Sequence, residues 1–392
     1  MSLTTTPNVR LAAEALEACK AFLSAALMFN TGGKSMHALN QFDEKRDWLN
    51  RALFNIDFGR LDSKVIDELV QGMTSDDAEG LLTARISLQK RETLFTNLLR
   101  RRAEYFHGGE DLRTAATKHC LARVYEIKGQ HGKALELYRC ALAVRQAAAG
   151  GGDLLVASTL NGMAIVFEAQ GLHSEALVQY SRALEIRQAA LGENHPLVAA
   201  CRNNMALVYK NQGLYEQALE CYERARVVQC EALGVLHPSV AVTLNNMAVV
   251  YNKQGMFDSA LLFCTRALDV QRQALGEGHL SAAATLSNMA IVYNSQGMHT
   301  EALEYYERAL GVRQKVLGNE HSSVGDTLYN IANVYQKLEL YEDAGASYAS
   351  AAVVYEKVYG VPHSETDDAR EKALMAFSLA KELRISSTLR QS

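Results

Sequence analysis

A fixed spacing of 42 residues runs through most of this 392-residue chain. Glycines recur at this spacing in two series, and an aromatic residue recurs at it in a third. The first glycine series is Gly129, Gly171, Gly213, Gly255 and Gly297. The second glycine series is Gly150, Gly192, Gly234, Gly276, Gly318 and Gly360. The aromatic series is Tyr125, Phe167, Tyr209, Tyr251, Tyr293 and Tyr335. A period of this length indicates one supersecondary unit per repeat, stacked on its neighbours to bury a common core.

Each unit is predicted to hold two helices. In the unit around Gly213, apolar residues up to Tyr209 recur at steps of three and four, which is the helical period. Gly213 should end this first helix, because glycine tolerates the left-handed backbone conformation. A second helix should begin near Tyr215 and end at Gly234. Pro238 then suits the first turn of the next helix, where a missing N–H has no consequence.

Two alanine series mark where the helices should touch, since small side chains permit close backbone approach. The first is Ala134, Ala176, Ala218, Ala260, Ala302 and Ala344. The second is Ala141, Ala183, Ala225, Ala267, Ala309 and Ala351. The predicted fold is all-α: a right-handed superhelical solenoid of helix pairs with a concave inner face, preceded by an irregular helical N-terminal region.

The period defines three predicted regions. Residues 1–110 form a helical N-terminal region, 111–362 form six 42-residue repeats, and 363–392 form a C-terminal capping helix with a short tail. In the first region we expect helices at about 9–29, 35–54, 61–72 and 77–107. Gly108 is in phase with Gly150, so the stretch before it is compatible with a degenerate capping repeat. A last helix is expected over 364–385, with Ser364 and Asp367 as its capping box.

Composition excludes several classes of protein. The formal net charge is −4, whereas a nucleic-acid binder needs a concentrated basic surface. The longest apolar run is about eight residues, and a bilayer span needs ~20. The N-terminus carries Glu14 and Glu17 without a basic leader, which favours neither a secretory signal nor a transit peptide. Seven cysteines without a C-x-x-C pair favour free thiols in a reducing compartment.

Histidines also keep the period, at His195, His237, His279, His321 and His363. Successive units should lie ~10 Å apart, whereas zinc ligands lie ~2 Å from one ion, so we expect a capping or packing role for each histidine. The chain has no recognisable nucleophile–base pair and no phosphate-binding glycine loop. We therefore predict a non-enzymatic protein without metal or cofactor.

The repeats resemble the tetratricopeptide repeat. The resemblance rests on the segment from Leu244 to Gly255, with Ala260 and Ala267 after it. The R-A-L motif at 266–268, the L-G-x-x-H-P motif at 191–196 and the repeat length are similar to the kinesin light chain and nephrocystin-3 group. This resemblance covers about residues 113–360 and implies a fold that binds protein partners.

Asparagines form the most informative polar series. Asn204, Asn246, Asn288 and Asn330 keep the 42-residue step, two residues before an alanine predicted to contact the partner helix. We therefore expect them on the concave face. Asparagine is a mediocre helix former, so helix propensity does not explain the series. A carboxamide both donates and accepts hydrogen bonds, so a ladder of them can bind the backbone of an extended peptide. The alternative is that each asparagine only ties neighbouring first helices together.

The resemblance supports the ladder, because kinesin light chains bind extended cargo peptides, often acidic with an aromatic anchor, in this groove. The first two repeats depart from the asparagine series, because they have Cys120 and Gly162 at the asparagine position. The full predicted binding set comprises the ladder and its neighbours, namely Asn204, Asn246, Asn288, Asn330, Asn211, Asn252, Asn294, Lys210, Lys253, Arg202 and Lys337.

Kinesin light chains also carry a heptad coiled coil that engages the heavy chain. Here a heptad reading from Leu81 reaches Leu88 and Phe95, but the alternate seam holds Ala84 and Arg91. Sustained heptads are needed for a coiled coil, so we do not expect a kinesin heavy chain as partner.

Two functions fit these features. The first is a peptide-binding adaptor, and the second is a structural scaffold of a cytoskeletal, microtubule-based or ciliary or flagellar assembly. The expected location is the cytoplasm, with the cytoskeleton or a cilium or flagellum as the specific site of a scaffold. The asparagine ladder favours the adaptor, and the absence of heptads favours the scaffold over a true light chain.

Overall fold

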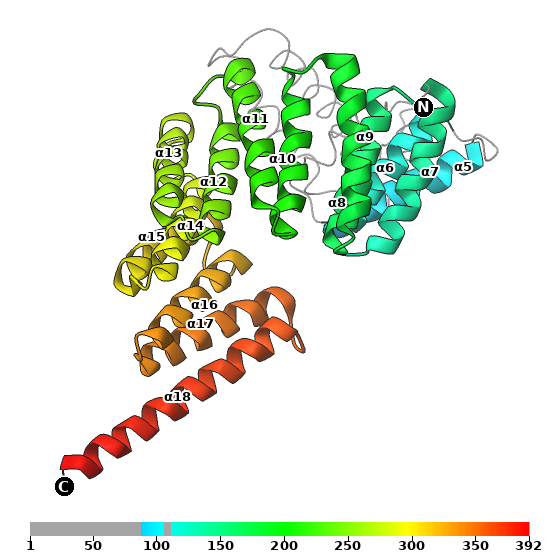
Figure 1. The fold of residues 1–392 in the computed structure, drawn as a ribbon. Coiled ribbons are helices and arrows are strands. Elements are labelled where there is room, and N and C mark those ends of the chain that lie inside the picture. The colour runs from blue at the N-terminus through cyan, green and yellow to red at the C-terminus, as the bar shows by residue number, and fades with distance from the viewer. Residues whose placement is uncertain (1–87, 106–110, 150, 392) are drawn as a thin grey trace, which may run out of the picture. The chain divides into compact units, whose positions relative to one another are not determined.

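The computed structural model describes residues 88–105, 111–149 and 151–391, and all fourteen elements in these ranges are α-helices (Figure 1). The helices expected at 9–29, 35–54 and 61–72 lie outside the described residues. The helix expected over 77–107 is represented by α5. Contacts divide the chain into two compact units, Met1–Gly192 and Glu193–Ser392.

The described part of the first unit contains two helix pairs after α5. Each first helix packs on the second helix of its pair, and α7 also contacts α8. The helices are α5 (Leu88–Tyr105), α6 (Leu112–Ile127), α7 (His131–Ala149), α8 (Leu154–Ala169) and α9 (His173–Leu191).

The second unit contains four helix pairs and a final long helix. First helices have 16 residues and second helices have 19. The first helices are α10 (Pro196–Asn211), α12 (Pro238–Lys253), α14 (Leu280–Ser295) and α16 (Ser322–Lys337). The second helices are α11 (Tyr215–Leu233), α13 (Phe257–Leu275), α15 (His299–Leu317) and α17 (Tyr341–Tyr359). The last helix is α18 (Ser364–Gln391), which packs on α17. Neighbouring first helices are also in contact: α10 contacts α12, and α12 contacts α14.

Both alanine series lie where predicted. Every member of both is fully buried, with no exposed surface. In one cluster, Ala206 of α10 and Ala218 of α11 pack with the large Tyr222 and with Met247 of α12. Small residues on facing helices thus allow close approach while a large ring fills the adjoining space.

Glycines end the helices as expected. Gly213 follows α10 with φ of 77° and Gly234 follows α11 with φ of 91°, both in the left-handed region. Glu339 occupies the corresponding turn after α16 with φ of 60°. A non-glycine residue there is strained by roughly 1–2 kcal/mol, so the surrounding helices must hold this turn in place.

The periodic histidines cap helices. The Nδ1 atoms of His195, His237, His279 and His321 accept hydrogen bonds from the backbone N–H two residues later, at 3.1–3.2 Å. This confirms the capping role. His363 does the same for Glu365 at 3.4 Å, so the cap of α18 is His363, and the predicted capping box at Ser364 is wrong by one position.

The buried face of α18 consists of Thr366 and four alanines, namely Ala369, Ala373, Ala376 and Ala380. Phe377 of the same helix is 44% exposed. Its ring lies over Gly345 of α17, where an added Cβ would be 2.7 Å from the ring. The helix also runs six residues beyond the predicted end at 385.

Candidate peptide-binding surface

The predicted ladder lies on the first helices of the second unit. Asn204, Asn246, Asn288 and Asn330 stand at the same position of α10, α12, α14 and α16, and each is half-buried. We call these four residues the open amide row, after Asn246, Asn288 and Asn330, whose side chains make no hydrogen bond among the described residues. On α12 the residues on either side of Asn246 are buried, as Asn245 and Met247 are, so Asn246 stands at the edge of the exposed face.

A second row of side chains, one residue earlier, ties neighbouring first helices together. Asn203 of α10 donates from Nδ2 to Thr243 Oγ1 of α12 at 2.9 Å, and Thr243 donates to Gln229 Oε1 of α11 at 2.8 Å. One repeat later, Asn245 donates to Thr285 of α14 at 2.6 Å, and Thr285 donates to Gln271 of α13 at 2.8 Å. The tie between repeats therefore exists, and it runs through Asn203 and Asn245.

The first unit builds the same tie with different residues. His119 of α6 stands at the repeat position of Asn203, and its Nδ1 lies 3.4 Å from the guanidinium of Arg145 in α7. Arg145 is 1% exposed and donates to Thr159 Oγ1 of α8 at 2.6 Å and to the carbonyl of Leu155 at 2.9 Å. We call His119, Asn203 and Asn245 the brace row.

Burial first, and then the charges of Arg145 and Arg123, lower the pKa of His119 to about 3. The imidazole is therefore neutral at physiological pH, with Nδ1 free to accept from the guanidinium. A neutral ring acts here as a hydrogen-bonding side chain, as the amides do in the second unit.

The open amide row differs in its hydrogen bonding. Among the described residues, the side chains of Asn246, Asn288 and Asn330 make no hydrogen bond, although each is only half-buried. Their amides therefore present both donors and an acceptor at the protein surface.

The remaining predicted site residues fall into two groups. Asn211, Lys253 and Lys337 lie seven residues after members of the row, two turns along the same face, and are exposed. Lys210, Asn252 and Asn294 lie six residues after them, roughly a third of a turn away.

Contacts inside the protein already engage part of this second group. Asn294 Oδ1 lies 2.9 Å from His299 Nδ1 and accepts from Lys337 Nζ at 3.1 Å, while Asn252 Oδ1 is buried without a partner. Arg202 forms an ion pair with Glu193 at 2.5 Å. The structure therefore brings together the open amide row with Asn211, Lys253 and Lys337, and directs Arg202 elsewhere.

The tetratricopeptide repeat family matches this sequence over residues 113–189, 155–231, 239–322 and 324–365. The chain belongs to the tetratricopeptide repeat family. The recognition made from the repeat motifs is thereby confirmed, and the family supports interaction with protein partners. A comparison with curated proteins gives no match.

Solved structures similar to this tetratricopeptide repeat protein include proteins of the kinesin light chain type. One is BtubC (BKLC) from P. vanneervenii, with 26% identity, a TM-score of 0.49, and coverage of 59% of this chain and 93% of that one. Another is a Podosopora anserina putative kinesin light chain with nearly identical repeats, with 24% identity, a TM-score of 0.45, and coverage of 53% and 98%. A Rap protein complexed with competence and sporulation factor has 16% identity, a TM-score of 0.53, and coverage of 90% and 99%. The last likeness concerns the fold alone.

Sequence reasoning missed an aliphatic row beside the amides of this repeat protein. Leu207, Val249 and Ile291 stand three residues after Asn204, Asn246 and Asn288, on the same face of their helices. Leu207 and Val249 are half-buried, and Ile291 is 41% exposed. The signal was present in the sequence, since these residues keep the 42-residue step but lie outside the core-facing pattern.

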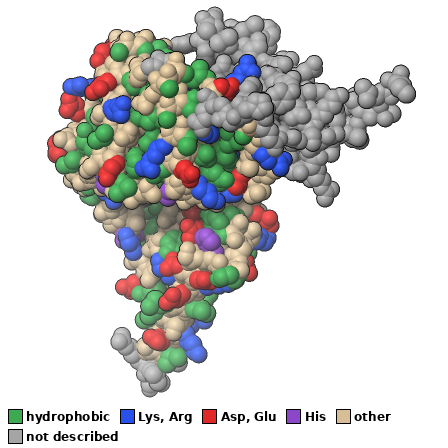
Figure 2. Space-filling view, turned by 90° about the vertical axis from the view of Figure 1, so that its right-hand side faces the viewer, with side chains coloured by type: hydrophobic (Ala, Val, Ile, Leu, Met, Phe, Trp, Pro, Cys, Tyr) green, Lys and Arg blue, Asp and Glu red, His purple; other side chains and the backbone are tan. Residues whose placement is uncertain are grey.

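Other surfaces offer less. No cluster of three or more His, Cys, Asp or Glu that could hold a metal occurs in the part of the chain that the structure describes. None of the described helices has the length and apolarity to cross a membrane. Figure 2 shows acidic and basic side chains interspersed over the face that it presents.

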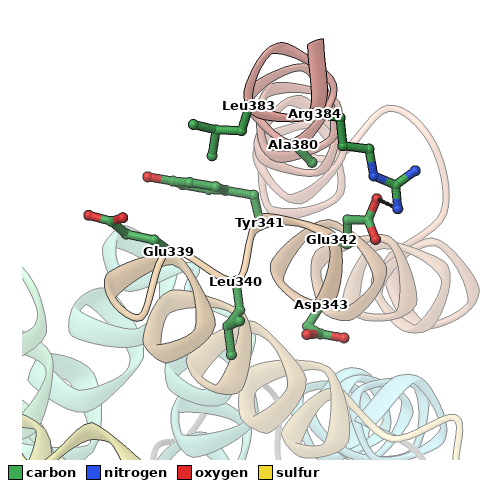
Figure 3. Close-up of a pocket in the computed structure, with 8 residues that line it drawn as sticks. All are labelled: Glu339, Leu340, Tyr341, Glu342, Asp343, Ala380, Leu383 and Arg384. Atoms are coloured by element: carbon green, nitrogen blue, oxygen red, sulfur yellow. Dashed lines mark ion pairs between the residues drawn. The ribbon is translucent and has the colours of Figure 1, made fainter. Parts of the chain in front are cut away.

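A separate hollow lies between the turn after α16 and the overhanging part of α18 (Figure 3). Tyr341 and Leu383 line it, and Glu342 of α17 pairs with Arg384 of α18 at its edge. None of the predicted binding residues belongs to this hollow.

Proposed function

We propose that this tetratricopeptide repeat protein is a non-enzymatic adaptor that binds an extended peptide segment of a partner across α10, α12, α14 and α16. The open amide row supplies the hydrogen bonds to the peptide backbone. Its role in the cell is to hold a partner through this segment.

The observation that carries the proposal is that Asn246, Asn288 and Asn330 make no hydrogen bond among the described residues, whereas Asn203 and Asn245 donate to threonines of the next repeat. On α10 and α12 the tie between repeats is made by Asn203 and Asn245, so this tie does not account for Asn246. Polar groups that are half-buried and unpaired in the free protein gain hydrogen bonds when a ligand covers them.

An extended peptide suits this arrangement. Its backbone presents N–H and C=O groups at intervals of ~3.3 Å, and these are the partners that a carboxamide can bind through both its donor and its acceptor. Backbone recognition by amides depends little on the side chains of the ligand, so sequence preference must come from neighbouring residues on the same face.

The test begins with a random peptide library selected on the full chain. The affinity of a selected peptide is then measured by calorimetry on Asn246→Ala/Asn288→Ala, with Gln273→Ala/Gln314→Ala as matched control. Both control amides are exposed on second helices, α13 and α15.

Loss of several hydrogen bonds, each worth ~0.5–1.5 kcal/mol, should weaken binding at least about tenfold in the first variant and leave the control unchanged. Unchanged binding in a folded Asn246→Ala/Asn288→Ala protein would contradict the proposal. It would place the contact on another surface, as a structural scaffold requires.

A further inference from the structure

Selectivity for the ligand can be read from the side chains that flank the open amides. On α12, Val242, Asn246, Val249 and Lys253 follow one another at steps of three and four, so they share one face. On α14 the same face holds Ala284, Asn288, Ile291 and Ser295. Val242 is 54% exposed and Ile291 is 41% exposed. Apolar side chains on neighbouring helices therefore form a repeated feature of this face.

The distance between successive first helices sets the spacing at which side chains of the ligand must recur. Side chains of α10 and α12, and of α12 and α14, bond directly at 2.9 Å and 2.6 Å. Helices in such contact have axes ~8–10 Å apart. A polyproline II chain rises ~3.1 Å per residue with three residues per turn, so equivalent side chains recur every ~9.3 Å. A β-strand brings a side chain back to the same face after two residues, or ~6.7 Å, which does not match.

Charge adds a second condition. The exposed face of α12 ends in Lys253, and that of α16 ends in Lys337, and both lysines are exposed. On α12 and α14 this face carries no acidic side chain. At the position of Val242 and Ala284, α16 has Asp326, which accepts a hydrogen bond from Tyr355 at 2.9 Å. The apolar section of the face therefore ends at α14, and its only charge is positive.

We propose that the face formed by α10, α12 and α14 selects a polyproline II segment with an aliphatic side chain at every third position and acidic residues between. The aliphatic side chains contact Leu207, Val249 and Ile291 in turn, with Val242 beside them on α12, while the amides of Asn246 and Asn288 bind the intervening backbone. Because this inference rests on the proposed function, its test separates the two.

The probes are two peptides of one composition. The first consists of the repeat Leu-Pro-Glu, which keeps leucine at every third position. The second contains the same residues in another order, with leucines in adjacent pairs, so that leucine no longer recurs at every third position. Both are titrated into the full chain by calorimetry. A third peptide with lysine in place of glutamate tests the charge condition.

Two double variants isolate the aliphatic contacts. Val242→Ser/Ile291→Ser removes apolar surface from the proposed face. The matched control is Val353→Ser/Val227→Ser, whose side chains are 53% and 41% exposed on α17 and α11. Circular dichroism melting of each variant confirms that it is folded.

We expect the Leu-Pro-Glu peptide to bind at least tenfold more tightly than the reordered peptide and than its lysine analogue. We expect Val242→Ser/Ile291→Ser to lose at least tenfold in affinity and the control to lose none. Equal binding of the two leucine peptides overturns the inference, and so does failure of both to bind. If equal binding is still weakened by Asn246→Ala/Asn288→Ala, the proposed function stands and only the periodic selection fails. If those asparagine substitutions leave it unchanged, the proposed function fails too.

Discussion

On α10 and α12 the brace row and the open amide row stand one residue apart, yet their surroundings differ. Asn245 is 8% exposed and bonds Thr285 at 2.6 Å, whereas Asn246 is half-buried and makes no hydrogen bond among the described residues. One residue turns a side chain by about 100° around a helix. That rotation separates a residue that joins two repeats from one that faces outward.

The two rows also differ in which residues occupy the equivalent position in other repeats. The brace position is filled by asparagine in three repeats, at Asn161, Asn203 and Asn245, and by His119 in the repeat before them. His119, Asn203 and Asn245 each form a hydrogen bond inside the protein. The open position is filled by asparagine in four repeats but by glycine at Gly162. Gly162 lies against the buried ring of Tyr138, so the open row cannot extend into that repeat.

The largest expected effect comes from forcing the open row into the first unit. In Gly162→Asn, a Cβ would meet the ring of Tyr138 at 2.6 Å, and overpacking of this kind lowers the free energy of unfolding by about 3 kcal/mol. Gly311→Asn is the control, because a Cβ at this glycine of α15 meets nothing within 4 Å. Urea denaturation measures both. A Gly162→Asn protein as stable as the parent would mean that Tyr138 does not block the row.

A smaller effect is expected from the brace row itself. Asn245→Ala leaves Thr285 without its donor and should lower the free energy of unfolding by about 1–2 kcal/mol. The effect stays moderate because Asn245 Oδ1 is already buried without a partner. Asn246→Ala should change stability by less than about 0.5 kcal/mol. If thermal melting ranks the two variants in the reverse order, the roles assigned to the rows are exchanged.

The next effect appears only in acid. Because the folded-state pKa of His119 is lowered to about 3, folding requires the neutral ring, and the stability that it contributes is present above its unfolded pKa near 6.5. This stability is lost as the pH falls from about 6.5 towards 3, by up to about 1.4 kcal/mol per pH unit. His119→Asn places the brace amide there and should remove this part of the slope. Denaturant titrations at pH 7 and pH 5 give the free energy of unfolding of both proteins. If it falls by the same amount in the parent and in His119→Asn, His119 is not held neutral.

Much of the architecture could be predicted from the sequence because the 42-residue period marks the helix ends, the helix contacts and the helix caps together. The glycines that end helices, the alanines between helices and the capping histidines each recur at one fixed phase, and each has a local physical cause. The Ser364 cap failed because two adjacent polar residues can both serve as a cap, and only the backbone decides between them.

The candidate site was harder to predict for a similar reason. Asn203 and Asn204 are neighbours that both recur, and the helical period places them near the same boundary. Which of them meets the next repeat depends on the rotation of α10 against α12, which is set by packing around Ala206 and Met247 rather than by either asparagine. The exposed aliphatic residues, such as Ile291, were missed because apolar residues on a helix were assigned to the core.

The most direct test of the account follows the side-chain amides themselves. In protein labelled with ¹⁵N at asparagine, the Nδ2 resonances of Asn246 and Asn288 are recorded while a library-selected peptide is titrated to saturation. The account predicts that these resonances shift and that those of Asn203 and Asn245 stay in place. Unchanged Asn246 and Asn288 resonances in the saturated complex would contradict it, because the peptide would then be bound without the open amide row.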